Sequence, residues 1–245
     1  MDLDDPAKAL KHVLSGLIDV ALRTPDQILR RRNLTQWSEL EQQVFYALLD
    51  DPSFPLKRHK EGFHVSDPAN LICHAASHFD LQQLSVKLTW QEFEKLVTNA
   101  LEQCEFKVVK NFHFTAGARK KRWEVDVIGI RGPHLIAFDA KHWTRTTQAP
   151  SALEKAASNQ KARVAALAGY SKLGDLLFQL GITHTRLTLV PAIVTLFDPP
   201  FELAQCGVPA MSIRNLSYFL QHFEVIFPKI WTIPAGTISL QRRLI

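Results

Sequence analysis

The spacing of hydrophobic residues in the first third of the chain predicts helices. In "ALKHVLSGLIDVALR" apolar residues recur every three or four positions. "SELEQQVFYALLDD" begins with Ser38 and has Glu41 three residues later, the spacing of a helix capping box. Residues 51–70 mix prolines, a glycine and both charges, which is typical of a connection. We therefore predict a helical N-terminal domain over residues 1–88.

The pattern changes at residue 89. Thr89 is a predicted cap for the amphipathic helix "WQEFEKLVTNALEQC". Strands are predicted in "FKVVKNFHF", "WEVDVIGI" and "HLIAFDAKHW", and a long helix in "SALEKAASNQKARVAALAGY". "RLTLVPAIVTLF" is almost wholly apolar, as expected of a buried parallel strand, and "VPAMSI" and "RNLSYFLQHF" predict a short strand and a helix. This order predicts an α/β domain over 89–245 with a mixed sheet flanked by helices; the pattern assigns no structure to 223–245.

Charge and composition narrow the functional classes. The 245 residues carry a net charge of +5, and the pI of about 9.2 is compatible with a nucleic-acid partner. The N-terminus is acidic and has no apolar signal core, and no apolar run is long enough to span a bilayer, so we expect a cytoplasmic protein. Two basic clusters are candidate DNA contacts, with a solvated surface as the alternative for each: Arg30, Arg31, Arg32 and Arg119, Lys120, Lys121, Arg122.

Acidic residues and a lysine interrupt the predicted strands of the second domain. Asp139 and Lys141 are two residues apart, so they lie on the same face of a strand. Asp126 lies in the preceding strand, with Glu124 on the same face, and a tight turn brings these two strands side by side. Glu94, on the helix before the strands, would face the sheet if that helix packs on it. The sequence therefore predicts one cluster.

This set of residues suits phosphodiester hydrolysis. Clustered carboxylates repel one another, and a divalent cation removes that cost. Mg²⁺ prefers a few carboxylate oxygens together with water and phosphate oxygens, and it activates a bound water. A lysine on the same strand face can orient the attacking water and offset the negative charge of the transition state.

The pattern Glu94…Val125-Asp126…Phe138-Asp139-Ala140-Lys141 resembles the PD-(D/E)xK nuclease superfamily, which has the restriction-endonuclease-like fold. "EFEKLVTNALEQCEFKVV", "WEVDVIG" and "LIAFDAKHW" are most similar to its Mrr-type and archaeal Holliday-junction-resolvase branches. The resemblance covers roughly residues 90–220. It implies an αβββαβ core and a DNA endonuclease dependent on Mg²⁺, for which Mn²⁺ can substitute. It also implies that Asp126, Asp139, the Ala140 carbonyl and Glu94 bind the metal and that Lys141 serves the attacking water.

Several alternatives remain open from the sequence. Asp139 and Lys141 could be a structural ion pair at a strand end, and Glu92 is a rival to Glu94 on the same helix. Gln160 on the long helix and Glu124 are accessory candidates. An RNA-directed nuclease and a non-catalytic nucleic-acid-binding or assembly protein are the alternative functions. We expect DNA as the partner and a homodimer, because cleavage of a duplex must address two strands.

Overall fold

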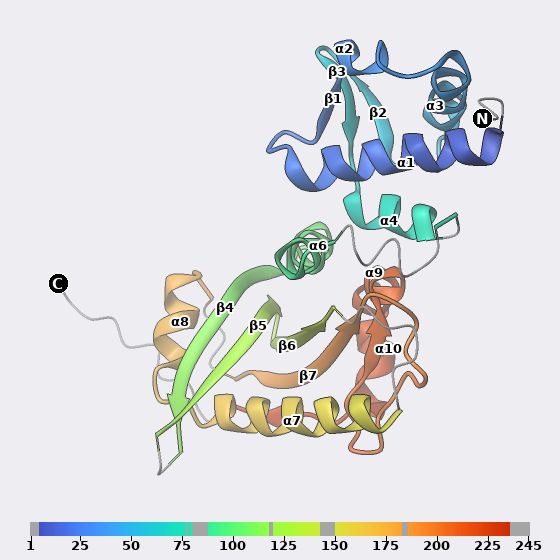
Figure 1. The fold of residues 1–245 in the computed structure, drawn as a ribbon. Helices are drawn as coiled ribbons and strands as arrows, with labels where there is room; N and C mark the ends of the chain where they lie inside the picture. Colours follow the sequence, from blue (N-terminus) through green and yellow to red (C-terminus); the bar gives the residue numbers. More distant parts are fainter. Residues whose placement is uncertain are drawn as a thin grey trace. The chain divides into compact units, whose positions relative to one another are not determined.

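The computed structural model describes residues 5–76, 78–79, 88–117, 120–142, 150–182 and 186–235. The chain divides into two compact units, Met1–Leu88 and Thr89–Ile245. Each unit is described by itself (Figure 1).

The N-terminal unit combines helices with a small antiparallel sheet. Its elements in chain order are α1 (Pro6–Arg23), β1 (Ile28–Arg30), α2 (Arg31–Leu34), α3 (Glu39–Asp50), β2 (Leu56–His59), β3 (Gly62–Val65) and α4 (Pro68–Ala76). The strand order is β1-β3-β2, and both pairs are antiparallel. The predicted capping box of Ser38 and Glu41 begins α3.

The N-terminal unit contains the predicted helices but also strands that were not predicted, since β2 and β3 occupy the predicted connection over residues 51–70. Strands of three or four residues are too short for hydrophobic alternation to distinguish them from a loop. Gly62 pairs with Arg30 on β1, and a Cβ atom at Gly62 would lie 2.1 Å from the Leu29 carbonyl oxygen. Glycine is therefore required by the close approach of two backbones, a reason that sequence inspection does not reveal.

The second unit contains the predicted α/β arrangement. Its elements are α6 (Trp90–Gln103), β4 (Lys107–Ala116), β5 (Lys121–Arg131), β6 (His134–Lys141), α7 (Pro150–Ala168), α8 (Leu173–Gln179), β7 (Thr188–Thr195), β8 (Ala210–Ser212), α9 (Ile213–Gln221), α10 (Phe223–Ile226), a 3₁₀ turn (Phe227–Lys229) and β9 (Ile233–Pro234). The strand order is β4-β5-β6-β7-β8. β4, β5 and β6 are antiparallel neighbours, whereas β6, β7 and β8 are parallel. The α/β class with a mixed sheet is confirmed.

Helices cover the sheet on both faces. Figure 1 shows the sheet of this unit between α6 and α7. Residues Leu135 to Ala140 of β6 are all buried, which explains why this central strand reads as an apolar run. The short α8 and β9, which pairs with β7, were not predicted. Within the described ranges, no helix has the length and apolar character needed to cross a membrane.

Candidate active site at the ends of β5 and β6

Asp126 and Asp139 meet because of the register of β5 and β6. The last paired residues of these strands are Val127 and Phe138, and each aspartate lies one residue beyond. Opposed residues of antiparallel strands point to the same face, so the two side chains share one side of the sheet. The Asp126 carboxylate replaces the missing ladder bond, because its Oδ2 accepts a hydrogen bond of 2.8 Å from the Ala140 N–H.

Asp139 is buried and paired with two cations. The residue is only 3% exposed. Its Oδ2 lies 2.9 Å from Lys141 Nζ, and its Oδ1 accepts a hydrogen bond of 3.1 Å from Arg163 Nη1. Asp139 and Lys141 therefore share a strand face, as their spacing predicts. The carboxylate is neutralised on both sides, which offsets the cost of burying its charge.

Arg163 on α7 is a member of the site that sequence reasoning missed. Its guanidinium contacts both Asp139 and the side-chain oxygen of Gln160. The available signal was the spacing of three residues between Gln160 and Arg163, which places both on one helix face. Arg163 is half-buried, and its contacts with Asp139 and Gln160 hold its positive charge next to the buried carboxylate.

Gln160 is fully buried and holds this arrangement from α7. Its Nε2 donates a hydrogen bond of 2.7 Å to the Ala137 carbonyl. Gln160 thereby ties α7 to β6, and its side-chain oxygen accepts a hydrogen bond from Arg163.

Glu94, rather than Glu92, faces the cluster. Glu92 forms the capping box of α6 with Thr89. Glu94 is 5% exposed, and its buried Oε1 has no hydrogen-bond partner. Burial raises the pKa of Glu94 to about 7, and the charges of Asp126 and Glu124 add to this rise. Glu94 is therefore within electrostatic range of Asp126.

Asp126 also holds its proton more tightly than a free aspartate. Burial raises the pKa of Asp126 to about 6, and the charge of Asp139 acts in the same direction. The Ala140 N–H, Arg163 and Lys141 oppose this rise. Glu124 is exposed, with its Oε1 3.9 Å from His113 Nε2, so it contributes charge from the rim.

Two aspartates and a backbone carbonyl are the oxygen donors of the predicted metal site. Asp126 and Asp139 supply the carboxylate oxygens, and the buried Glu94 oxygen that lacks a partner does not join them in a group of three ligands. The described residues contain no group of three His, Cys, Asp or Glu side chains close enough together to hold a metal. Two carboxylates and a carbonyl oxygen leave positions for water and phosphate, as Mg²⁺ requires. Metal binding here would displace Lys141 or Arg163 from Asp139.

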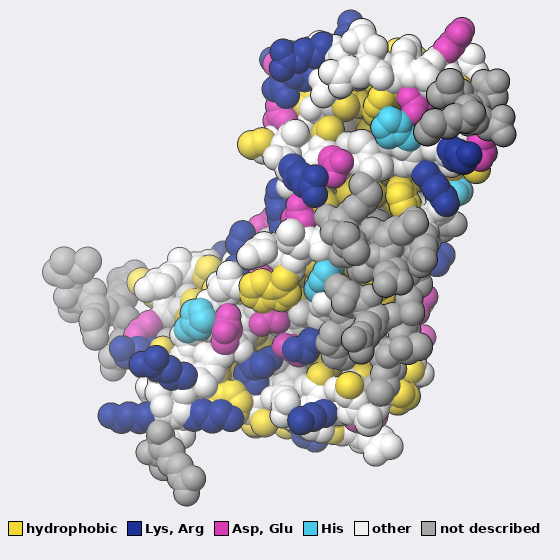
Figure 2. Space-filling view, in the orientation of Figure 1, with side chains coloured by type: hydrophobic (Ala, Val, Ile, Leu, Met, Phe, Trp, Pro, Cys, Tyr) yellow, Lys and Arg dark blue, Asp and Glu magenta, His cyan; other side chains and the backbone are white. Residues whose placement is uncertain are grey.

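The candidate DNA-binding residues occupy two separate surfaces. Lys120, Lys121 and Arg122 are exposed where β4 turns into β5, and Lys121 Nζ lies 3.7 Å from the centroid of the Trp123 ring. Figure 2 shows Lys and Arg side chains gathered over this end of the hairpin, and acidic and basic side chains over the sheet between α6 and α7. Arg119 lies outside the described residues.

The other basic cluster belongs to the N-terminal unit. Arg30 is paired with Asp26, whose Oδ2 lies 2.8 Å from Arg30 Nη2. Arg31 and Arg32 are exposed on α2. The three arginines therefore do not form one equivalent group, since Arg30 is partly neutralised.

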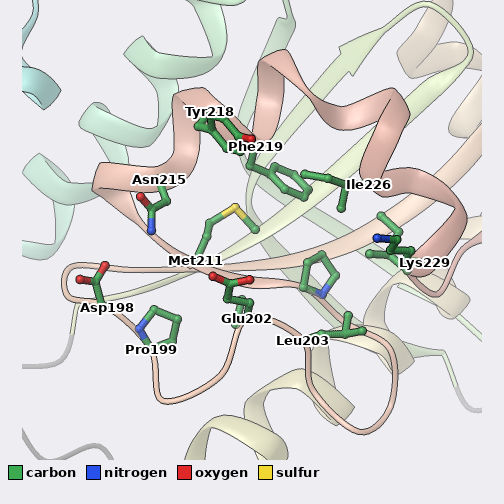
Figure 3. A pocket seen from close by; sticks show the side chains of 13 residues that line it. Asp198, Pro199, Glu202, Leu203, Met211, Asn215, Tyr218, Phe219, Ile226 and Lys229 are labelled. Atoms are coloured by element: carbon green, nitrogen blue, oxygen red, sulfur yellow. The ribbon is translucent and has the colours of Figure 1, made fainter.

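A cavity of about 720 Å³ in the second unit is separate from the carboxylate cluster. Figure 3 shows its lining around Met211, Tyr218 and Phe219, from β8 and α9. Its Asp198 accepts a hydrogen bond of 2.6 Å from the Ser212 hydroxyl. None of the predicted catalytic residues lines this cavity.

The raised pKa values predict a stability that depends on pH. Glu94 and Asp126 bind protons more tightly in the folded chain than in the unfolded chain, so protonation stabilises the fold. The stabilisation is complete below the unfolded pKa, which is 4.5 for Glu94, and is lost as pH rises through about 7. Glu94→Gln should remove the cost of a buried negative charge at high pH. The free energy of unfolding at pH 8 should therefore rise by about 1–2 kcal/mol.

Thermal unfolding between pH 4.5 and 8, without divalent cations, measures this effect. Glu102→Gln is the matched control, because Glu102 is exposed on the same helix. An unchanged pH dependence of Tm in Glu94→Gln would show that Glu94 does not carry the raised pKa.

Comparisons with known proteins add no functional information. No family model matches the chain, and no curated protein matches its sequence. Among solved structures, protein VC1899 from Vibrio cholerae is similar with 13% identity and a TM-score of 0.30, over 94% of this chain and 58% of VC1899. The chain thus spans 58% of the length of VC1899. A score this low supports no inference about the fold or the function.

Proposed function

We propose that the chain is a metal-dependent endonuclease that hydrolyses DNA phosphodiester bonds. The observation that carries the proposal is the meeting of Asp126, Asp139 and Lys141 on one face of the sheet, at the point where the pairing of β5 with β6 ends. A buried carboxylate with a raised pKa next to a second carboxylate and a cation, as Asp126 is, is typical of functional sites. The resemblance to PD-(D/E)xK nucleases supports the same interpretation.

Each residue has a role that follows from its place. Asp126, Asp139 and the Ala140 carbonyl would hold Mg²⁺ or Mn²⁺, with Glu94 completing the acidic environment. When bound, the metal supplies positive charge beside the scissile phosphate and activates the attacking water. Lys141 is half-buried beside Asp139, where its ammonium group can orient this water and balance the growing negative charge. Gln160 and Arg163 fix Asp139 from α7.

A structural role for the same residues is the second candidate. Asp139 already has two cationic partners, Lys141 and Arg163. In this alternative, the sole role of the ion pairs is to hold β6 against α7. In that case the chain would be a non-catalytic nucleic-acid-binding protein. Metal-dependent cleavage separates the two candidates.

The test is incubation of the purified protein with a panel of nucleic acids. Linear, branched, single-stranded and methylated DNAs, with an RNA of the same sequence, are compared in Mg²⁺, Mn²⁺ and EDTA. The proposal expects cleavage of at least one DNA in the metal-containing samples and none in EDTA. Preferential cleavage of RNA would assign the runner-up activity, and no cleavage would favour the structural role. Sedimentation of the same protein tests the expected homodimer.

The basic end of the β4–β5 hairpin should contact the phosphate backbone. Arg122→Ala and Lys120→Ala each remove one exposed charge, so each should weaken DNA binding about equally for all sequences. The slope of log K against log salt should flatten by roughly 0.9 on a duplex for each ion pair with a phosphate that the substitution removes. Lys172→Ala, an exposed lysine before α8, is the control. Unchanged salt slopes would leave the hairpin charges as solvated surface.

A further inference from the structure

A small cleft lies within the N-terminal unit, between α2, α3 and the β2–β3 hairpin. Its volume is about 440 Å³, which suits a ligand the size of one nucleotide. All three elements contribute to its lining, which includes Arg31, Thr35, Gln42, Tyr46, Arg58 and Phe63. The cleft is formed by this unit alone.

The rim of this cleft is positively charged. Arg31 is exposed, and among the described residues no carboxylate lies within ion-pair distance of it. Arg58 Nη2 lies 3.5 Å from Asp50 Oδ1, but both side chains are largely exposed and such a pair is weak. Figure 2 shows Lys and Arg side chains gathered at the α2 end of this unit. These charges are available to an anion.

The cleft also presents an aromatic ring. Tyr46 is 41% exposed, although its ring is held by edge contacts with Phe45 and Phe63 at centroid distances of 5.4 and 6.4 Å. Gln42, one turn earlier on α3, donates a hydrogen bond of 3.0 Å to the Trp37 carbonyl. A fixed and partly exposed ring beside cations is the combination that binds single-stranded nucleic acid, by stacking on bases and pairing with phosphates.

The charge of α3 argues against insertion of this helix into a duplex groove. Its sequence contains Glu39, Glu41 and Asp50 and has no lysine or arginine. A helix in the major groove runs between two rows of phosphates, which would repel these carboxylates. The cations of the cleft come instead from α2 and the hairpin.

We propose that this cleft binds a nucleotide within single-stranded DNA. The base stacks on Tyr46, and Arg31 and Arg58 pair with the phosphates on either side. The inference deepens the proposed function, because it makes a single-stranded segment part of the substrate. It also predicts a contact that does not depend on the carboxylates of the second unit.

The experiment measures binding by the full chain in EDTA, which prevents metal-dependent cleavage. Fluorescence anisotropy with a labelled oligothymidine and with a duplex of equal length gives both affinities. Tyr46→Ala should weaken single-strand binding about tenfold, and Tyr46→Phe, which keeps the stacking face, should bind like the parent protein. Arg31→Ala and Arg58→Ala should each flatten the single-strand salt slope by roughly 0.7.

Lys11→Ala, which removes an exposed charge from α1, is the matched control and should leave both affinities unchanged. Equal single-strand affinity of Tyr46→Ala and the parent protein would overturn the inference, as would tighter binding of an RNA of the same sequence. If Tyr46→Ala lowered duplex affinity as much as single-strand affinity, the inference would also be overturned. Tyr46→Ala could also lose single-strand binding while the parent protein cleaves none of the nucleic acids. That result would support the cleft as a binding site and reject the nuclease proposal.

Discussion

Asp139→Asn should abolish both DNA cleavage and metal binding, whereas Lys141→Ala should abolish cleavage alone. The asparagine keeps the size of the side chain but removes the charge that attracts the cation, so Mn²⁺ affinity should fall by about 100-fold or more. Lys141→Ala leaves both aspartates in place and removes only the group that orients the water. Its cleavage rate should fall by about 10²–10⁴-fold, with metal and DNA still bound.

Calorimetry with Mn²⁺ and a cleavage assay measure these two effects separately. Asp175→Asn is the matched control, because Asp175 is exposed on α8. The structural role predicts that both variants lower Tm and that neither affects a metal-dependent activity, so the activity distinguishes the two roles. Cleavage at the parent rate by either variant would end the nuclease assignment at this site.

Arg163→Ala should destabilise the metal-free protein and make it respond more strongly to metal. Arg163 Nη1 lies 3.1 Å from a carboxylate oxygen of the buried Asp139, so its removal leaves that charge with Lys141 as the remaining cationic partner. The free energy of unfolding should fall by about 1–3 kcal/mol. A divalent cation can then occupy the vacated side of Asp139 without displacing an arginine, so Mn²⁺ should raise Tm more in the variant than in the parent protein.

Unfolding of both proteins at increasing Mn²⁺ concentration is the measurement. Lys155→Ala removes an exposed cation from the same helix and should change stability by less than about 0.5 kcal/mol. Arg163→Lys keeps the charge but loses the planar geometry, so it should fall between the parent and the alanine variant. An alanine variant with a smaller Mn²⁺ response than the parent would show that Arg163 supports metal binding instead of competing with it.

The burial of Asp139 gives Asp139→Asn a structural cost as well. Asp139 is 3% exposed and bonded to α7 through Arg163. We therefore expect Asp139→Asn to lower Tm as well as metal affinity, because a half-buried guanidinium loses its charged partner. Circular dichroism at a temperature below the transition must show that the variant is folded.

Local patterns in the sequence determined several elements of both units. The capping box of Ser38 and Glu41 in α3 needs only residues within one helical turn and forms as predicted, and Thr89 caps α6 as predicted. The shared face of Asp139 and Lys141 follows from the two-residue repeat of a strand. The buried β7 follows from its apolar run, because a central parallel strand is covered on both faces.

Tertiary structure decided which residues of each element matter. The sequence left Glu92 and Glu94 as rivals, and only the packing of α6 on the sheet shows that Glu94 is buried within electrostatic range of Asp126, whereas Glu92 belongs to the capping box. Arg163 reaches Asp139 through the crossover of α7, a contact between residues 24 apart that no local pattern encodes. The small sheet of the first unit depends likewise on pairing between Leu29 and Phe63, far apart in the chain. Hydrophobic periodicity is a property of neighbouring residues, whereas ion pairs across elements and short strands depend on which surfaces meet in the folded chain.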